Sequence, residues 1–299
     1  MPNFLKFPLN LFICGALFFG CTNTPAPIDS HFNRGVEYYD NKELAKAIEE
    51  YKLALRKNPK DTFALYNLGV VYQDQGKNDR AMELYQDVLK HTEDTFSRIN
   101  LASIQYSQGK KEEAFLQLNT AAQKNPDSAH PLSVLGEFLE KEGKLDEAEQ
   151  TYIKALNIDS KHSASHYRLG QLLFKKQKFD LGTEHILKAV DLDPENPAYL
   201  EALGNEFERS GKLLDAAHSL ERVSVLEPDR FEVYVRLGDI YKKNKMYQEA
   251  LTRYWSALSI KSDEPYIHRS VLEIYKTLSD LEIEKLKKLE GQSSFAQTH

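Results

Sequence analysis

The sequence predicts an all-α solenoid, a stack of small helix pairs. The first observation is a series of small residues at a period of 34 residues, with one residue missing between the second and third: Gly35, Gly69, Gly136, Gly170, Gly204 and Gly238. A second series of small residues follows it by about twelve positions: Ala47, Ala81, Ala114, Ala148, Gly182, Ala216 and Ala250. Between them, apolar residues follow the 3.6-residue period of a helix rather than the alternation of a strand. Self-similarity at such a period is the signature of a stacked array of supersecondary units.

Seven units of this array occupy residues 28–264, and each is predicted to hold two helices. The units begin at Ile28, Thr62, Thr95, Ala129, Ser163, Pro197 and Phe231. The first helix has apolar residues at repeat positions 4, 7, 8 and 11, and the second at positions 20, 24, 27 and 28. We interpret the small residues at positions 8 and 20 as points where the backbones of the two helices approach closely, so that a bulky side chain would separate them.

Glycine and proline mark the ends of these helices. A Gly-Lys turn separates the two helices in four units, and its glycine supplies the left-handed conformation that closes a helix. Asn41 and Asn244 are expected to take this role in units that lack the glycine. Proline follows the second helix in four units, because it lacks an N–H and its ring clashes with a helical backbone: Pro59, Pro126, Pro194 and Pro228.

The C-terminal segment differs from the repeats. Residues 265–290 begin like an eighth unit and then become highly charged with one apolar stripe, which is typical of a cap that covers its neighbour on one side only. We expect capping helices here, followed by a flexible tail at 291–299.

This pattern resembles the tetratricopeptide repeat, a helix–turn–helix unit of 34 residues. The resemblance covers 28–264 and holds in seven units, although position 4 lacks the usual Trp. It implies a right-handed superhelix that binds proteins or peptides. A coiled coil is the rival helical interpretation, but heptads would not place small residues at 34-residue intervals.

The N-terminus is predicted to be a lipoprotein signal peptide, residues 1–20, followed by a lipidated cysteine and short linker at 21–30. Leu9–Gly20 is apolar but too short to span a bilayer. Leu17-Phe-Phe-Gly-Cys21 resembles a bacterial lipobox, which would make Cys21 the site of lipid attachment, although Phe18 and Phe19 are bulkier than usual. The alternatives are an uncleaved anchor or an ordinary signal peptide that is cleaved nearby.

Composition argues against several classes of function. The net charge is −6 and there is no basic block, which argues against nucleic-acid binding. Apart from Cys21, the only cysteine would leave with the signal, so no disulfide, catalytic thiol or zinc site is expected. His162 and His166 have the i, i+4 spacing of metal sites, but they lie across an inter-helix turn and lack a clustered carboxylate. We therefore expect no enzyme, no metal, no cofactor and no small-molecule substrate.

The inner face of the array is the expected binding surface. In tetratricopeptide arrays the first-helix positions 2, 5, 9, 12 and 13 line an inner groove, and here they carry eight aromatic side chains: Phe32, Tyr39, Phe63, Tyr66, Phe96, Tyr106, Tyr167 and Phe174. Any one of them could instead serve packing between helices, but an apolar groove of this size usually marks a binding site. The sixth and seventh units present mixed charges at the same positions, among them Glu201, Glu208 and Lys242. The resemblance excludes a carboxylate clamp, because positions 2 and 5 lack the required cations.

These features together favour an envelope lipoprotein, held at a bacterial membrane through Cys21, that scaffolds a protein or peptide partner. The expected location is the periplasmic face of the outer membrane. Two alternatives remain open: a surface-displayed lipoprotein that binds extracellular or host ligands, and a regulatory subunit of an envelope enzyme.

Overall fold

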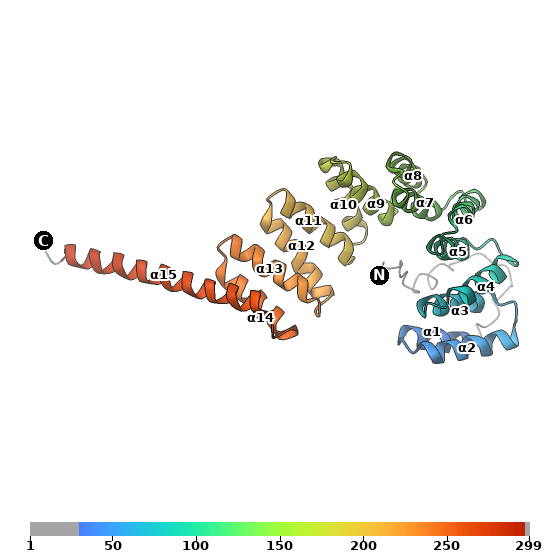
Figure 1. Ribbon diagram of the computed structural model, residues 1–299, viewed down its shortest axis with the longest axis horizontal. Helices are drawn as coiled ribbons and strands as arrows, with labels where there is room; N and C mark the ends of the chain where they lie inside the picture. Colours follow the sequence, from blue (N-terminus) through green and yellow to red (C-terminus); the bar gives the residue numbers. More distant parts are fainter. Residues whose placement is uncertain (1–29, 297–299) are drawn as a thin grey trace, which may run out of the picture. The chain divides into compact units, whose positions relative to one another are not determined.

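The computed structural model describes residues 30–296, and every regular element in that range is a helix (Figure 1). The predicted signal peptide and Cys21 lie outside the described residues. The helices are α1 (Ser30–Asp40), α2 (Leu44–Lys57), α3 (Thr62–Asp74), α4 (Asn78–Leu89), α5 (Thr95–Ser107), α6 (Lys111–Lys124), α7 (His130–Lys141), α8 (Leu145–Ile158), α9 (Ser163–Lys175), α10 (Phe179–Leu192), α11 (Pro197–Arg209), α12 (Leu213–Leu226), α13 (Phe231–Lys243), α14 (Tyr247–Ile260) and α15 (Pro265–Ala296).

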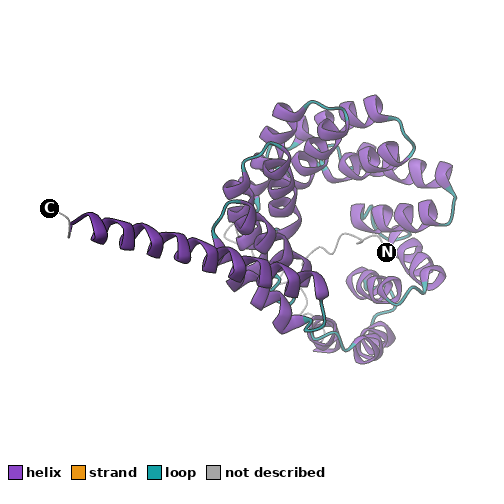
Figure 2. Cartoon of the chain, turned by 60° about the vertical axis from the view of Figure 1, so that its left-hand side comes forward, coloured by secondary structure: helices purple, strands orange, loops and turns teal. Residues whose placement is uncertain are grey.

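The chain forms two compact units, an N-terminal unit that ends at Thr92 and holds α1–α4, and a C-terminal unit that begins at Glu93 and holds α5–α15. In each unit consecutive helices pack as pairs, and each pair packs on the next. Figure 2 shows these helices joined by short loops. We call the first helix of each pair the A helix and the second the B helix. The seven pairs from α1–α2 to α13–α14 confirm the predicted all-α solenoid.

The recurrent glycine at repeat position 8 makes room for a large side chain sixteen residues later. A Cβ added at Gly136 would lie 2.5 Å from the ring of Tyr152, and one added at Gly35 would lie 2.6 Å from the ring of Tyr51. Both tyrosines are completely buried. In these repeats the glycine therefore accommodates a ring on the B helix, rather than the backbone approach that we expected from the sequence.

The fifth repeat is where the two backbones do approach closely. A Cβ at Gly170 would lie 2.9 Å from the carbonyl oxygen of Gly182, and one at Gly182 would lie 3.0 Å from the carbonyl oxygen of Gly170. The ring of Phe174 fills the space over Gly182, 2.4 Å from its added Cβ. The close backbone approach that we expected from the small residues is therefore found between α9 and α10.

The turn inside each repeat uses a left-handed residue at position 15. Four of these residues are the predicted glycines, with φ of 72° at Gly76, 80° at Gly109, 76° at Gly143 and 76° at Gly211. In the other repeats they are Lys42, Gln177 and Lys245, with φ of 62°, 60° and 60°. The expectation that Asn41 and Asn244 take this role was wrong. The backbone requires positive φ at one position of the repeat, so the register of the repeat outweighs the preference of the residue type.

Side chains cap several A helices. Asp61 accepts hydrogen bonds from the backbone N–H groups of Phe63 and Ala64, both at 3.1 Å, and Asp94 accepts one from Ser97 at 2.6 Å. These contacts satisfy N–H groups that have no partner inside the helix. They fix where α3 and α5 begin, and so fix the positions of Phe63 and Phe96.

The C-terminal end differs from the expected capping helices, because α15 is a single helix of 32 residues that runs through Gly291 to Ala296. No proline interrupts the sequence after Pro265, and one glycine costs a helix only about 1 kcal/mol. None of the described helices is both long enough and apolar enough to cross a bilayer.

Candidate partner-binding surface

The A helices lie on the inner side of the curve in each unit. Successive A helices contact one another more closely than any successive B helices do, at α1–α3 in the N-terminal unit and at α5–α7 and α7–α9 in the C-terminal unit. Layers that curve bring their inner elements together and spread their outer ones. The aromatic side chains predicted to line a groove are therefore carried by inner helices.

The N-terminal unit exposes one of its four predicted aromatic residues. Phe63, at the start of α3, has 64% of its surface exposed. Phe32 and Tyr66 are half-buried, and their rings lie 5.9 Å from that of Tyr51 and 5.8 Å from that of Tyr85. These two side chains pack within their own repeats.

Tyr39 joins the two A helices of the N-terminal unit. Its hydroxyl donates a hydrogen bond to Asp74 at 2.7 Å, from α1 to α3. Burial, and then the hydrogen bond and charge of Asp74, raise the pKa of Tyr39 well above its ordinary value. The phenol therefore remains a neutral donor at physiological pH and holds an exposed carboxylate on the inner surface.

The C-terminal unit leaves three of its four predicted aromatic residues partly buried and packed against neighbouring groups. Phe96, 37% exposed, lies 5.7 Å from the ring of His130. Tyr106 stacks on Phe138 at 4.2 Å and donates a hydrogen bond to Glu142 at 2.6 Å. Burial, and then that carboxylate, raise the pKa of Tyr106 to about 12. This residue connects its repeat to the next one.

Tyr167 and Phe174, on α9, also pack against neighbouring groups. The ring of Tyr167 lies 4.7 Å from that of Tyr199, and its hydroxyl oxygen accepts a hydrogen bond from Gln171 at 2.7 Å. Phe174 packs against the core of the C-terminal unit. Of the eight predicted aromatic residues, the structure thus leaves Phe63 most exposed, followed by Phe96.

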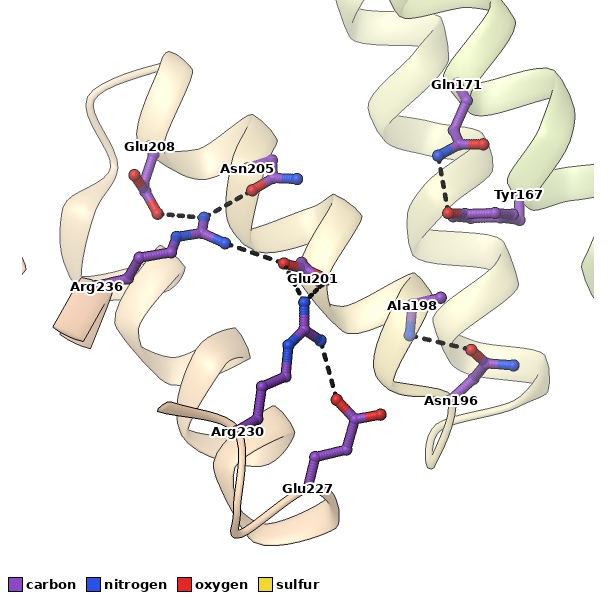
Figure 3. A network of polar contacts seen from close by, with 10 residues as sticks. All are labelled: Tyr167, Gln171, Asn196, Ala198, Glu201, Asn205, Glu208, Glu227, Arg230 and Arg236. Carbon is purple, nitrogen blue, oxygen red and sulfur yellow. Dashed lines mark hydrogen bonds and ion pairs between the residues drawn. The ribbon is translucent and has the colours of Figure 1, made fainter. Parts of the chain in front are cut away.

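Arginines neutralise the mixed-charge part of the inner surface (Figure 3). Arg236, on α13, donates to Glu201 at 3.2 Å and to Glu208 at 2.6 Å, both on α11. Arg230 donates to Glu201 at 2.8 Å and to Glu227 at 2.9 Å. Two guanidinium groups therefore share the carboxylate of Glu201, and the ion pairs tie the sixth repeat to the seventh.

The same arrangement recurs along the inner surface of the C-terminal unit. Arg168 pairs with Glu137 of the preceding A helix at 2.9 Å, and Lys242 pairs with Glu273 of α15 at 2.5 Å. Because these charges pair with one another, a partner would have to displace an existing ion pair in order to use them. Partly exposed pairs of this kind contribute about 0–1 kcal/mol each.

His162 and His166 do not face a common ligand. The Nδ1 atom of His162 accepts a hydrogen bond from the N–H of Ser165 at 3.2 Å, so this side chain caps α9. His166 lies with its Nε2 atom 3.1 Å from the carbonyl oxygen of Ser160 and its Nδ1 atom 2.9 Å from Nδ1 of His185. Among the described residues there is no group of three or more histidine, cysteine or carboxylate side chains that could hold a metal ion.

A polar depression of about 660 Å³, which we did not predict, lies between two inter-repeat loops of the C-terminal unit. His130 and His162 line it together with Asp127 and Asp159, and the two histidine rings lie 5.9 Å apart. Burial, and then the nearby His162, lower the pKa of His130 to about 4. A histidine at position 2, where two preceding repeats carry Phe63 and Phe96, was the available signal for this site.

Family models for the tetratricopeptide repeat match the chain over most of the described range. They cover residues 35–76, 64–99, 129–162, 163–196 and 201–265. The chain belongs to the tetratricopeptide repeat family. Repeats of this family bind protein or peptide partners and typically serve as scaffolds without enzymatic activity.

Solved structures share the tetratricopeptide repeat fold. A chain of the APC/C hetero-tetramer Cut9–Hcn1 has a TM-score of 0.59 at 16% identity, covering 84% of this chain and 49% of that one. A tetratricopeptide repeat protein from Parabacteroides merdae has a TM-score of 0.51 at 22% identity, covering 82% and 97%. The C-terminal part of a repeat protein from Cytophaga hutchinsonii has a TM-score of 0.52 at 14% identity, covering 80% and 99%. The chain thus spans about half the length of the first of these structures. No curated protein matches it.

Proposed function

We propose that this tetratricopeptide repeat protein is a lipid-anchored scaffold of a bacterial envelope that binds a protein partner through the inner surface of its N-terminal unit. The family supports the scaffold role. The observation that carries the binding surface is the exposure of Phe63, since 64% of a large aromatic side chain faces solvent on an inner helix. Buried aromatic anchors dominate protein interfaces, and an exposed one is a candidate anchor.

The surroundings of Phe63 favour an apolar peptide that also carries positive charge. Tyr66 and Phe32 supply apolar surface in the same unit, while the carboxylates of Asp40 and Asp74 are exposed on its A helices. An aromatic side chain or aliphatic residue of the partner would pack on Phe63, and a Lys or Arg would pair with Asp74, which already accepts a hydrogen bond from Tyr39.

Replacing Phe63 with Ala tests the binding surface. The partner is first captured by a photo-crosslinking amino acid placed at position 63. Phe63→Ala should then weaken its binding by about 2 kcal/mol or more while leaving the melting temperature nearly unchanged, because the side chain is exposed in the free protein. Leu116→Ala is the matched control, since Leu116 is equally exposed, at 63%, but lies on a B helix.

Two results would contradict the binding proposal. One is that a photo-crosslinking amino acid captures the same proteins to the same extent at position 116 as at position 63, which would mean that position 63 has no specific partner. The other is a large fall in melting temperature for Phe63→Ala that accounts for all the lost binding.

The membrane anchor rests on the lipobox-like sequence Leu17–Cys21 and is tested separately. Cys21→Ser should move the protein from the membrane fraction to the soluble fraction, because stable attachment requires two acyl chains or an equivalent second signal. A Cys21→Ser protein that stays in the membrane after an alkaline wash would show that the segment is a true anchor. Digestion of the protein by a protease added to intact cells would place it on the cell surface instead of the periplasmic side.

A further inference from the structure

The last helix extends beyond the elements on which it packs. The first part of α15 buries Ile267, Val271 and Ile274 against the core formed with α14. Leu278 is the last residue to pack on that core, and every residue from Ser279 to Leu289 is exposed. Figure 1 shows the end of α15 extending away from the other helices of the C-terminal unit. About three turns of described helix therefore face solvent on all sides.

The residue spacing of the buried face of α15 continues along the exposed part of the helix. Leu278, Glu282, Lys285 and Leu289 follow one another at intervals of four, three and four residues, so they lie on one line along the helix, continuous with the face that packs on α14. Leu281 and Leu286 flank this line on either side, and each is 51% exposed. Leu289 is 52% exposed. This is the a/d spacing of a helix that packs against another helix.

When two copies of this segment lie antiparallel, each residue on the line faces a residue that it can pair with. A two-fold axis between Ile283 and Glu284 places Leu278 opposite Leu289 of a second copy. The same axis places Glu282 opposite Lys285, and by symmetry Lys285 opposite Glu282. The pair would therefore have a leucine layer at each end and, between them, two layers in each of which a glutamate faces a lysine. An antiparallel pair satisfies all four layers, whereas a parallel pair in register would place Glu282 against Glu282 and Lys285 against Lys285.

We propose that residues 278–289 of α15 bind the same segment of a second copy of this chain as an antiparallel helix pair, from which residues 290–296 of each chain turn away, because α14 covers the face that they would otherwise meet. The two-fold contact uses the same patch on both chains, as closed dimers of identical subunits do. Leu278 and Leu289 bury apolar surface at the two ends, Leu281 and Leu286 cover the sides, and the central charges set register and direction. The charge complementarity selects this occupant over a generic apolar partner.

The contact is short, so the association is weak. Twelve residues of helix extend about 18 Å, which gives an interface at the small end of the range for specific complexes. Glu282 and Lys285 of one chain already lie 3.6 Å apart on the same helix, and both are well exposed. In the pair each would exchange this intrahelical contact for one across the interface, where neighbouring leucines exclude water.

The test uses charge exchange in the purified full chain, measured by sedimentation equilibrium over a concentration series up to about 500 µM, a range suited to small interfaces. The unaltered chain should show a monomer–dimer equilibrium. Lys285→Glu alone and Glu282→Lys alone should each lower the association constant at least about tenfold, because each places like charges in both central layers. Lys287→Glu is the matched control: the same charge change on the opposite side of the same exposed helix should leave association near that of the unaltered chain.

Mixing the two single variants provides the sharper experiment. In a mixed pair, the lysine introduced by Glu282→Lys on one chain faces the glutamate introduced by Lys285→Glu on the other. In the second central layer, the unaltered Lys285 of the first chain faces the unaltered Glu282 of the second. The mixture should therefore dimerise although each variant alone associates far more weakly, and circular dichroism should show equal helix content in all samples.

Three outcomes of these experiments would overturn the proposal. The first is an unaltered chain that stays monomeric over the whole concentration series. The second is association that no charge exchange alters, and the third is a mixture that associates no better than its two components.

Discussion

Tyr51, Tyr85, Tyr152 and Tyr254 occupy the same place in four repeats, and all four rings are completely buried. Their hydroxyl groups differ. Tyr254 donates to Asp239 at 2.6 Å and Tyr85 to Gln73 at 2.8 Å, whereas the Tyr51 hydroxyl has no hydrogen-bond partner among the described residues. A buried polar group without a partner costs free energy that a hydrogen-bonded one does not.

Removing the hydroxyl should therefore have opposite effects at two equivalent positions. Tyr51→Phe should leave the free energy of unfolding unchanged or raise it by about 1 kcal/mol, because it removes a buried group that has no hydrogen bond. Tyr254→Phe should lower it by about 1.5–3 kcal/mol, because it removes a bond to a carboxylate. Urea denaturation of both variants measures the difference, and an equal loss in both would show that the Tyr51 hydroxyl is satisfied in solution.

Within each helix pair, the residue at repeat position 8 must suit the size of the B-helix side chain that faces it. Gly136 faces the ring of Tyr152, whereas a Cβ at Gly204 would lie 3.4 Å from Leu220, which is an ordinary contact. The third repeat already carries the second combination, with Ala102 in the place of glycine and Leu118 in the place of tyrosine, both completely buried.

Alanine should accordingly stabilise one repeat and destabilise another. Gly204→Ala should raise the free energy of unfolding by up to about 1 kcal/mol, the difference in helix propensity between the two residues. Gly136→Ala should lower it by about 1–3 kcal/mol, because the buried ring of Tyr152 would have to move. Thermal melts of the two variants measure these changes. Destabilisation by Gly204→Ala would mean that α11 and α12 leave no room for the added methyl group beside Leu220.

The sequence predicted these helices well because the repeat supplies several copies of each signal. Prolines after B helices and glycines at four turns marked the ends of the helices, and small residues fixed the register. Single-copy features were harder to predict. Lys42 takes the left-handed conformation, although the preceding Asn41 is of a residue type that adopts it more readily. The length of α15 depends on the absence of a proline that would end the helix.

The predicted binding surface was defined less well, for a physical reason. The pattern identifies which residues lie on A helices, but not which of them pack against the next repeat. Phe63 and Phe96 share repeat position 2, yet Phe96 lies 5.7 Å from His130 of the next repeat and is 37% exposed, whereas Phe63 is 64% exposed. The identity of the residues in the neighbouring repeat decides this, and the period alone does not reveal it.

At the scale of the molecule, a solenoid responds to damage locally, because each repeat contacts only its neighbours. His130 is a point of sensitivity to acid in the C-terminal unit, since burial lowers its pKa to about 4 from an ordinary 6.5. Burial also lowers the pKa of His162 and of His185. Between pH 6.5 and about 4, His130 binds more protons in the unfolded chain than in the folded one, and the lowered pKa values of His162 and His185 act in the same direction. The contribution of His130 to stability is therefore complete above pH 6.5 and is lost as the pH falls toward 4.

Acidification should open the C-terminal unit first around the fourth and fifth repeats. Hydrogen exchange, corrected for the pH dependence of the intrinsic rate, should lose protection in α7–α9 before α11–α14 as the pH falls from about 7 to about 4.5. His130→Gln should reduce this loss, because the largest of the three shifts is removed, whereas His218→Gln on the exposed face of α12 should not. Uniform loss of protection across the unit would mean that it unfolds as one cooperative body.

The pairing of each glycine with a side chain on the partner helix of its own repeat constrains how such a gene can be rearranged. A recombination event whose breakpoint falls in a loop between repeats transfers the two matched residues together, so the descendant chain inherits a compatible pair. A breakpoint in the tight turn inside a repeat could join Ala102 to the helix of Tyr152, and the Cβ of the alanine would then collide with the buried ring. Whole repeats are therefore the units that duplication and exchange can move without loss of stability, and single helices are not.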